Sequence, residues 1–207
     1  MTQVKLTKNE LRLQQVKLQQ LTRYLPTLQL KKAMLQQEVN LLLQQLDDAK
    51  KEFEKDKSQS YHTAELLNKE GMKLFFDSLK IERLILDYEN IAGLDVPIFG
   101  DVEFAPVKYL GGNVPLWWDF ALEQMKRLIK EKEKVSVLNM KRKLLEKELR
   151  EVSIRVNLFE KVLIPRTVAN IKKIKIFLGD LQLSAVSQAK VAKAKIESKR
   201  EQMMGTA

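Results

Sequence analysis

The sequence predicts a mainly α-helical protein, in which a long antiparallel pair of helices forms a two-stranded coiled coil with a small helical and β-hairpin insert at one end. Three observations predict this fold. Apolar residues recur every seven positions near both ends of the chain, the middle lacks that repeat, and the 207 residues include only 7 glycines and 5 prolines. Few helix breakers are typical of long helices. We therefore divide the chain into an N-terminal coiled-coil arm (1–60), an insert (61–115) and a C-terminal coiled-coil arm (116–207).

The first arm is predicted to be one helix from about Thr7 to at least Phe53. Thr7 is a suitable N-cap, and Glu10 three residues later completes a capping-box pattern. Pro26 removes one backbone hydrogen bond inside the repeat, so we expect a bend there. Because the repeat continues across Pro26, one bent helix is favoured over two helices. The apolar seam of this arm consists of Leu18, Leu21, Leu25, Leu28, Leu35, Val39, Leu42 and Leu46.

The insert combines a short helix with a β-hairpin. Apolar spacing predicts the helix between residues 63 and 80. From about residue 84 to 112, β-branched and aromatic residues alternate with glycine and proline, which predicts short strands joined by turns. Pro97 should lie at a sheet edge or a strand end, because it cannot donate a backbone hydrogen bond. Of the adjacent Trp117 and Trp118, we expect one to pack inside and the other to be available to a partner.

The second arm is predicted to run as a helix from near Pro115 to about Gln202, since proline suits the first helical turn. Its apolar seam consists of Leu138, Leu145, Leu149, Val152, Val156, Phe159 and Leu163. Beyond Pro165 the repeat slips, because the step from Leu163 to Ile171 is eight residues and not seven. A slip beside a proline indicates a kink and a local change in supercoil.

Charge is unevenly placed along the chain, whose formal net charge is +10. Residues 1–57 carry 11 basic and 7 acidic groups (+4), residues 58–116 carry 5 and 9 (−4), and residues 117–207 carry 21 and 11 (+10). Basic arms of this kind attract nucleic acid, anionic membranes or acidic protein surfaces. The basic clusters contain no aromatic residues for base stacking, which favours an exposed coiled-coil face over nucleic-acid binding.

The residue types needed for catalysis are scarce. The chain has no cysteine and a single histidine, His62, so neither a thiolate metal site nor a histidine-based triad can be built. The only glycine pair, Gly111-Gly112, lacks the following lysine of a nucleotide-binding loop. No stretch resembles a signal peptide or a membrane span. We therefore predict a non-catalytic cytoplasmic chain that needs no cofactor.

Two motifs resemble a known family, the D subunit of V/A-type ATPases. Residues 155–165 resemble its Arg-Val-Asn…Glu…Ile-Pro segment, and residues 90–97 resemble its Asn-(Ile/Val)-x-Gly-x-x-Val-Pro insert. The resemblance covers nearly the whole chain in the expected order, and the segment 155–165 is its most specific part. The motif positions are Arg155, Val156, Asn157, Glu160, Ile164 and Pro165 in the second arm, and Asn90, Gly93, Val96 and Pro97 in the insert.

This resemblance implies a central-stalk component that acts as the axle of a rotary ATPase or ATP synthase coupled to H⁺ or Na⁺ movement. It implies partners in the A and B subunits of the headpiece, the small F subunit of the stalk and the C subunit that forms the membrane-side socket, with a location peripheral to the membrane. The residues expected to face the headpiece are Ile171, Ile174, Leu178, Leu181, Lys190 and Lys193. A basic coiled coil that binds nucleic acid and a helical scaffold are the alternatives.

Overall fold

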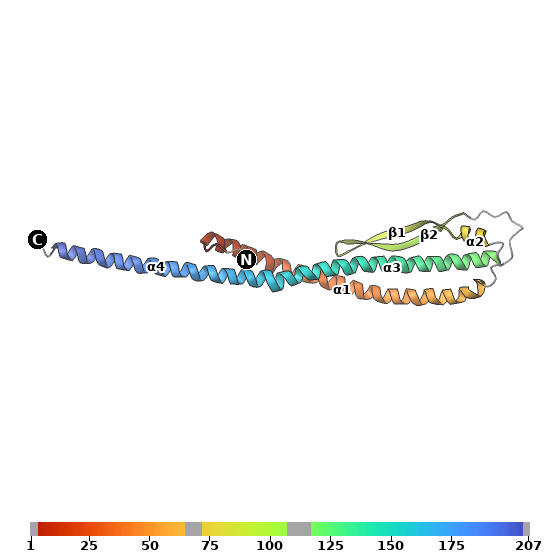
Figure 1. Cartoon of the computed structure of the whole chain (residues 1–207), viewed down its shortest axis with the longest axis horizontal. Coiled ribbons are helices and arrows are strands. Elements are labelled where there is room, and N and C mark those ends of the chain that lie inside the picture. Colours follow the sequence, from red (N-terminus) through yellow and green to blue (C-terminus); the bar gives the residue numbers. More distant parts are fainter. Residues whose placement is uncertain (1–3, 65–71, 107–116, 205–207) are drawn as a thin grey trace. The chain divides into compact units, whose positions relative to one another are not determined.

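The computed structural model describes residues 4–64, 72–106 and 117–204. The elements, in chain order, are α1 (Lys8–Ala64), α2 (Met72–Ser78), β1 (Ile81–Ile91), β2 (Leu94–Phe104), α3 (Trp118–Leu158), a π-helical turn η1 (Phe159–Leu163) and α4 (Ile164–Met204) (Figure 1). The predicted mainly α-helical fold with one β-hairpin is confirmed. The predicted helix start near Pro115 and the glycine pair Gly111-Gly112 lie outside the described residues.

The chain forms two compact units, and each takes segments from both arms. We call Met1–Gln29 with Ile154–Ala207 the terminal unit, and Leu30–Ser153 the insert unit. The insert unit holds the second half of α1, both strands, α2 and most of α3. The terminal unit holds the start of α1, the end of α3, η1 and α4. A division by compactness therefore cuts across the predicted division along the chain.

Helix α1 begins where the capping pattern predicts. The Glu10 amide donates to Thr7 Oγ1 over 3.3 Å, and the Leu11 amide donates to the Thr7 carbonyl over 3.0 Å. The Glu10 carboxylate accepts a hydrogen bond of 2.8 Å from Gln14 Nε2, one turn further on. Pro26 lies inside α1, which continues through it as a single helix, as the unbroken repeat predicts.

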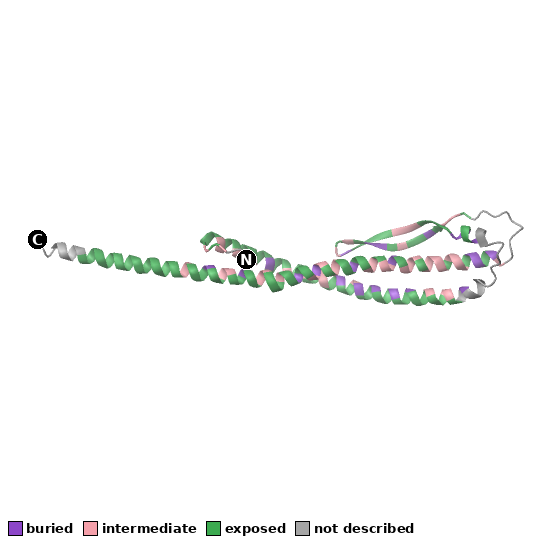
Figure 2. Ribbon diagram, in the orientation of Figure 1, coloured by how far each residue is buried: buried purple, intermediate pink, exposed green. Residues whose placement is uncertain are grey.

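In the insert unit, α1 and α3 lie side by side and antiparallel (Figure 1). Two ion pairs mark the direction. Lys31 Nζ of α1 lies 2.7 Å from Glu148 Oε1 of α3, and Asp56 Oδ2, further along α1, lies 2.9 Å from Arg127 Nε, nearer the start of α3. Between these pairs, buried and exposed residues alternate along both helices (Figure 2). The predicted antiparallel pair of helices is therefore present.

A separate apolar cluster joins α2 to the start of α3. Phe75 and Trp118 pack edge to face with ring centroids 5.2 Å apart, and both side chains are buried. Leu79, Ala121 and Leu122 complete the buried cluster. Trp117 is half-buried against it, so the expectation that one tryptophan packs inside is confirmed for Trp118.

The β-hairpin turns through Ala92 and Gly93, which both have positive φ (52° and 83°), as a tight two-residue hairpin loop requires. Asn90 holds this turn: its amide oxygen accepts from the Gly93 amide over 3.0 Å, and its Nδ2 donates to Asp95 Oδ1 over 2.6 Å. Pro97 lies opposite Tyr88 in a two-stranded sheet, where every strand is an edge strand. The prediction that Pro97 lies at an edge is confirmed.

The π turn η1 locates the predicted slip of the repeat. The Ile164 amide donates to the Phe159 carbonyl five residues back, and a π turn holds one residue more than an α-helical turn. After Val156, an unbroken three-and-four spacing would bury positions 159, 163 and 166. In the structure Arg166 is exposed and Thr167 is buried, so one residue has been added between Val156 and the next buried position.

Pro165 supplies a physical reason for the π turn. In a regular α-helix its ring would clash with the carbonyl of Lys161, and its missing N–H would leave that carbonyl without a partner. A wider turn immediately before the proline relieves this conflict. The slip therefore arises in η1, just before Pro165.

Candidate functional site: the apolar seam and the hairpin anchors

The predicted seam is buried or half-buried at every position. In the insert unit, Leu35, Val39, Leu42 and Leu46 of α1 and Leu145 and Val152 of α3 are buried, while Leu138 and Leu149 are half-buried. In the terminal unit, Leu21 and Val156 are buried, while Leu18, Leu25, Leu28, Phe159 and Leu163 are half-buried. Each buried aliphatic side chain stabilises the folded state by about 1.5–3 kcal/mol. The seam is therefore the main source of helix pairing in both units.

Ion pairs flank the seam of the insert unit at both ends. The Lys31–Glu148 pair is about three-quarters covered, and Asp56 has a side chain only 15 % exposed against Arg127. Glu52 lies 3.9 Å from Lys134 between them. Partly covered pairs between helices define which residues face one another, while exposed pairs add at most about 1 kcal/mol. The partly covered pairs therefore support the same alignment of α1 against α3 that the seam sets.

The hairpin is anchored along α3 by charges of opposite sign. Asp101 of β2 lies 2.7 Å from Lys130 Nζ, and Glu89 of β1 lies 3.3 Å from Lys141 Nζ. Lys126 Nζ also lies over the Phe104 ring, 5.4 Å from its centroid. The hairpin follows α1 and precedes α3 in the chain, and it folds back alongside α3 (Figure 1). These anchors hold the hairpin at two points along one helix.

A bulge lets the hairpin follow α3. The register skips Gly100, because Ile85 pairs with Asp101 while Leu86 pairs with Phe99. A Cβ at Gly100 would lie 3.0 Å from the Ile85 carbonyl oxygen, a distance that side chains avoid. A glycine bulge bends a strand and increases its twist. Because Gly100 has no side chain, the backbone of β2 can approach the Ile85 carbonyl oxygen of β1 at the bulge, next to the anchoring residue Asp101.

The anchor at Asp101 predicts a pH dependence. The hydrogen bond from Lys130 and then the Val102 amide lower the pKa of the Asp101 carboxyl below its ordinary value of 3.8. A lowered folded-state pKa contributes stability that is present above 3.8 and lost as pH falls through the folded value. We expect NMR shifts of β2 amides to change in this acid range, and Asp101→Asn to abolish the change. A transition that survives in Asp101→Asn would assign it to another carboxyl group.

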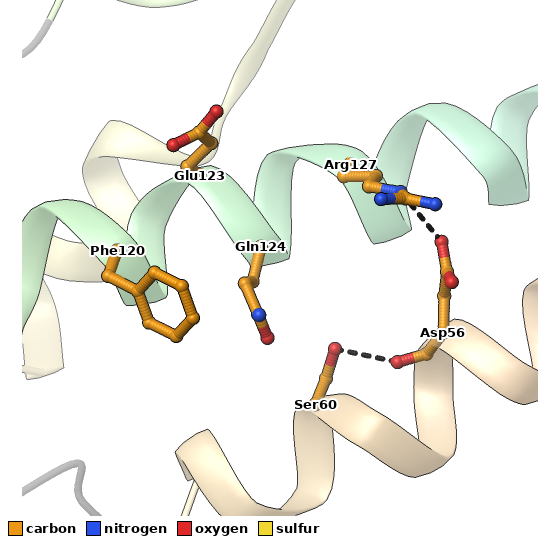
Figure 3. A pocket seen from close by; sticks show the side chains of 6 residues that line it. All are labelled: Asp56, Ser60, Phe120, Glu123, Gln124 and Arg127. Carbon is orange, nitrogen blue, oxygen red and sulfur yellow. Dashed lines mark hydrogen bonds and ion pairs between the residues drawn. The ribbon is translucent and has the colours of Figure 1, made fainter.

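A small pocket lies between the last turns of α1 and the first turns of α3. It has a volume of about 230 Å³, and Phe120, Gln124 and Arg127 of α3 face Asp56 and Ser60 of α1 across it, while the Glu123 side chain points away from α1 (Figure 3). Ser60 Oγ donates to the Asp56 carbonyl over 2.8 Å, and Arg127 holds the Asp56 carboxylate. In the described part of the chain no three His, Cys, Asp or Glu side chains converge as metal ligands. The pocket offers polar contacts and an exposed aromatic ring rather than a nucleophile.

The chain matches the protein family of the ATP synthase D subunit over residues 10–194. It is 42 % identical to the V-type ATP synthase D subunit of Chlamydia caviae over 205 residues, which cover 97 % of each chain. It is 44 % identical to the protein of the same name from Chlamydia pneumoniae over 202 residues, covering 96 % of this chain and 95 % of the relative. The chain belongs to the ATP synthase D-subunit family. The resemblance inferred from the two motifs is confirmed, and membership favours a central-stalk component of a V/A-type ATPase over a nucleic-acid-binding or scaffold protein.

The motif residues of this D-subunit family member divide between seam and surface. Val156 is buried and Ile164 half-buried, whereas Arg155, Asn157, Glu160 and Pro165 are exposed. In the insert, Val96 and Pro97 are buried, while Asn90 and Gly93 form the hairpin turn. The motifs thus combine packing positions with positions that shape the backbone.

The residues of this D-subunit chain that were predicted to face the headpiece differ in their accessibility. Ile174 was expected to face the headpiece, but its side chain is fully buried in the terminal unit. Ile171 and Leu178 are half-buried beside it, whereas Leu181, Lys190 and Lys193 are exposed. The physical reason is the added residue in η1, which shifts the buried positions of α4 from 166 and 173 to Thr167 and Ile174. Only the later residues have the accessibility that the prediction needs.

Every described side chain from residue 181 to 198 of α4 is exposed (Figure 2). Lys8 and Leu11, at the start of α1, line a groove together with α4 residues from Lys175 to Ala185. Since α1 begins at Lys8, the part of α4 beyond Ala185 extends past its partner helix within this unit. We call residues 186–198 the overhang. Its apolar residues Val186, Val191 and Ile196 are all more than half exposed.

The hairpin anchors were not among the predicted site residues of this D-subunit chain. The signal for them was the charge balance, since the insert is acidic (−4) and the second arm is basic (+10). Opposite charges on segments that fold against each other are expected to pair. Which acid meets which lysine depends on the Gly100 bulge and the direction of the hairpin, which the charge balance does not specify.

Within the described residues, no helix is long and apolar enough to cross a membrane.

Proposed function

We propose that this chain is the non-catalytic axle of the central stalk in a V-type ATP synthase and transmits torque between the ATP-converting headpiece and the membrane ion-translocating ring. Membership of the D-subunit family carries the proposal. The apolar seam within each unit supports it, because helices that are packed together over many turns resist twisting more than single helices do. The same seam would serve a ring that moves H⁺ and one that moves Na⁺.

The proposed partners follow the ends of the chain. The terminal unit, which includes both chain ends and the exposed overhang of α4, contacts the A and B subunits of the headpiece. The pocket between Asp56 and Phe120 lies toward the end of the helix pair that joins the insert, and we assign this end to the C subunit of the membrane-side socket. The small F subunit of the stalk binds the insert unit. The chain then lies on the cytoplasmic side as a peripheral member of the membrane-bound complex.

The assembled complex tests the proposed function. The full chain is combined with purified headpiece and the small F subunit, the headpiece is fixed to a surface, and a bead is attached to the chain. We expect the chain to co-purify with the headpiece and the bead to rotate in one direction when ATP is added. A headpiece that hydrolyses ATP at full rate without retaining the chain would contradict the proposal.

Two exposed apolar patches in the insert unit, one on each helix, are the proposed contacts for the small F subunit. Leu30 and Met34 of α1 lie near Lys31 in the sequence, and Met140 and Leu144 of α3 lie about two turns and one turn before Glu148. The Lys31–Glu148 ion pair joins the two helices at this place. Met140 also precedes Lys141, which holds the hairpin through Glu89. The proposed contacts for the small F subunit therefore include one patch on each helix and the neighbouring hairpin.

We expect Met34→Asp and Leu144→Asp each to weaken binding of the small F subunit at least tenfold, because a carboxylate in an apolar contact must be desolvated. Both side chains are 40–48 % exposed, so the chain itself should keep its thermal stability. Leu43→Asp is the matched control. Leu43 is similarly exposed, and because it comes nine residues after Met34 it lies on the opposite side of α1. Binding is measured by titration calorimetry. Equal weakening by Leu43→Asp would remove the patches from the interface.

A further inference from the structure

A groove beside the π turn is framed by three basic side chains. It lies in the terminal unit, has a volume of about 460 Å³, and is lined by Lys5, Lys17 and Arg166 together with Gln14 and Thr167. Gln14 interrupts the leucine repeat of α1, and Thr167 is the small polar residue that η1 brings into the seam of α4. A glutamine and a threonine fill less apolar space than two leucines. The groove therefore occurs where the seam changes from apolar to polar.

The π turn also places one of the cations. With an unbroken repeat, position 166 would point into the seam, and the added residue instead leaves Arg166 exposed at the edge of the groove. Lys5 and Lys17 are exposed on the α1 side of the same groove. The Thr167 hydroxyl is used inside α4, where it donates to the Leu163 carbonyl over 2.7 Å. The cations, not this hydroxyl, are the groups available to a ligand.

The lining residues of the groove carry more positive than negative charges. Its one acidic side chain, Glu10, accepts a hydrogen bond from Gln14 and leaves a formal charge of +2 over the lining residues. No described carboxylate forms an ion pair with Lys5, Lys17 or Arg166, although many lysines of α1 and α3 have such partners. Three cations around one concave surface repel each other and attract an anionic group.

We propose that this groove, which we call the cationic groove, binds an acidic segment of a headpiece subunit through carboxylates that reach Lys17 and Arg166. This inference rests on the proposed function, since the headpiece is the partner assigned to the terminal unit. Arginine favours two-pronged contacts with carboxylates, and the half-buried Asn170 amide adds a donor at the groove wall. None of the lining residues is aromatic, so the groove lacks the stacking surface that a nucleic acid would use.

The test compares two double variants of the full chain. Lys17→Gln with Arg166→Gln removes two charges from the cationic groove, and Lys172→Gln with Lys173→Gln removes two exposed charges of α4 outside it. Affinity for the purified headpiece is measured over a range of salt concentrations, with helical content checked by circular dichroism. We expect the groove variant to bind about tenfold more weakly with a smaller salt dependence, and the control to change less than twofold.

The outcomes separate the groove from the function. Equal weakening in both variants, or no change in either, would overturn the cationic groove as a headpiece site. If the wild-type chain itself does not bind the headpiece, the proposed function fails. Binding of single-stranded DNA that only the groove variant loses would also overturn the inference, because it would assign the groove to nucleic acid.

Discussion

A complex that carries Val152→Asp and Val156→Asp in this chain should still hydrolyse ATP but pump few ions. Both side chains are buried in the seam, with exposures of 0 % and 4 %. A carboxylate placed there replaces an aliphatic side chain in an apolar seam, and burying such a charged group costs several kcal/mol or forces the helices apart. Helices that separate at this point would let one end of the axle turn without the other. Proton or sodium uptake into vesicles, measured beside ATP hydrolysis, reports the coupling.

The control for this variant uses the same helix turns. Ile154→Asp with Leu158→Asp adds the same two charges on side chains that are 61 % and 43 % exposed. The free chain should lose thermal stability with the seam variant and keep it with the surface variant. Should the seam variant fail to assemble, Val152→Thr with Val156→Thr retains side-chain volume while placing two hydroxyls in the seam, and partial uncoupling is expected. Full coupling in an assembled and folded seam variant would contradict the axle mechanism.

The seam could be predicted from sequence because it depends on a local pattern. Residues such as Leu35, Val39 and Leu145 recur at three and four positions, and only one helix face can bury them. The N-cap at Thr7 and the hairpin turn at Gly93 were predictable for the same reason, since each depends on neighbours within a few residues. Their physical causes are contained in the sequence segment itself.

The features that sequence did not predict depend on contacts between distant segments. The hairpin anchors join Asp101 to Lys130 and Glu89 to Lys141, and their choice follows from how the hairpin folds against α3. The burial of Ile174 follows from the π turn, because one added residue decides which side of α4 faces α1. The slip was visible in the sequence as the eight-residue step from Leu163 to Ile171, but the burial of Ile174 was not. A slip in spacing does not by itself say which residues remain in the seam.

The added residue in η1 leads to a prediction about deletions. Removing Val162 together with Pro165→Ala should convert η1 to regular α-helix and leave Thr167 and Ile174 in the seam, because the repeat then becomes continuous. Removing Lys172 together with Pro165→Ala should instead rotate Ile174 and the residues after it out of the seam. Losing the burial of Ile174 and Leu178 costs about 3–5 kcal/mol. The two variants have the same length and the same proline replacement, so they differ in the position of the deletion and in the side chain removed.

Amide hydrogen exchange in the terminal unit distinguishes the two deletions. With Val162 deleted, protection of the α1 amides before Gln29 should equal or exceed that of the Pro165→Ala parent, because a strained turn has been removed. With Lys172 deleted, the same amides should exchange faster, since the helix that covers them no longer presents its apolar side. If both deletions lower protection equally, the π turn would not be the added residue of the repeat. If both leave it unchanged, the seam beyond Pro165 would contribute little to pairing, and the axle would be held together by the insert unit alone.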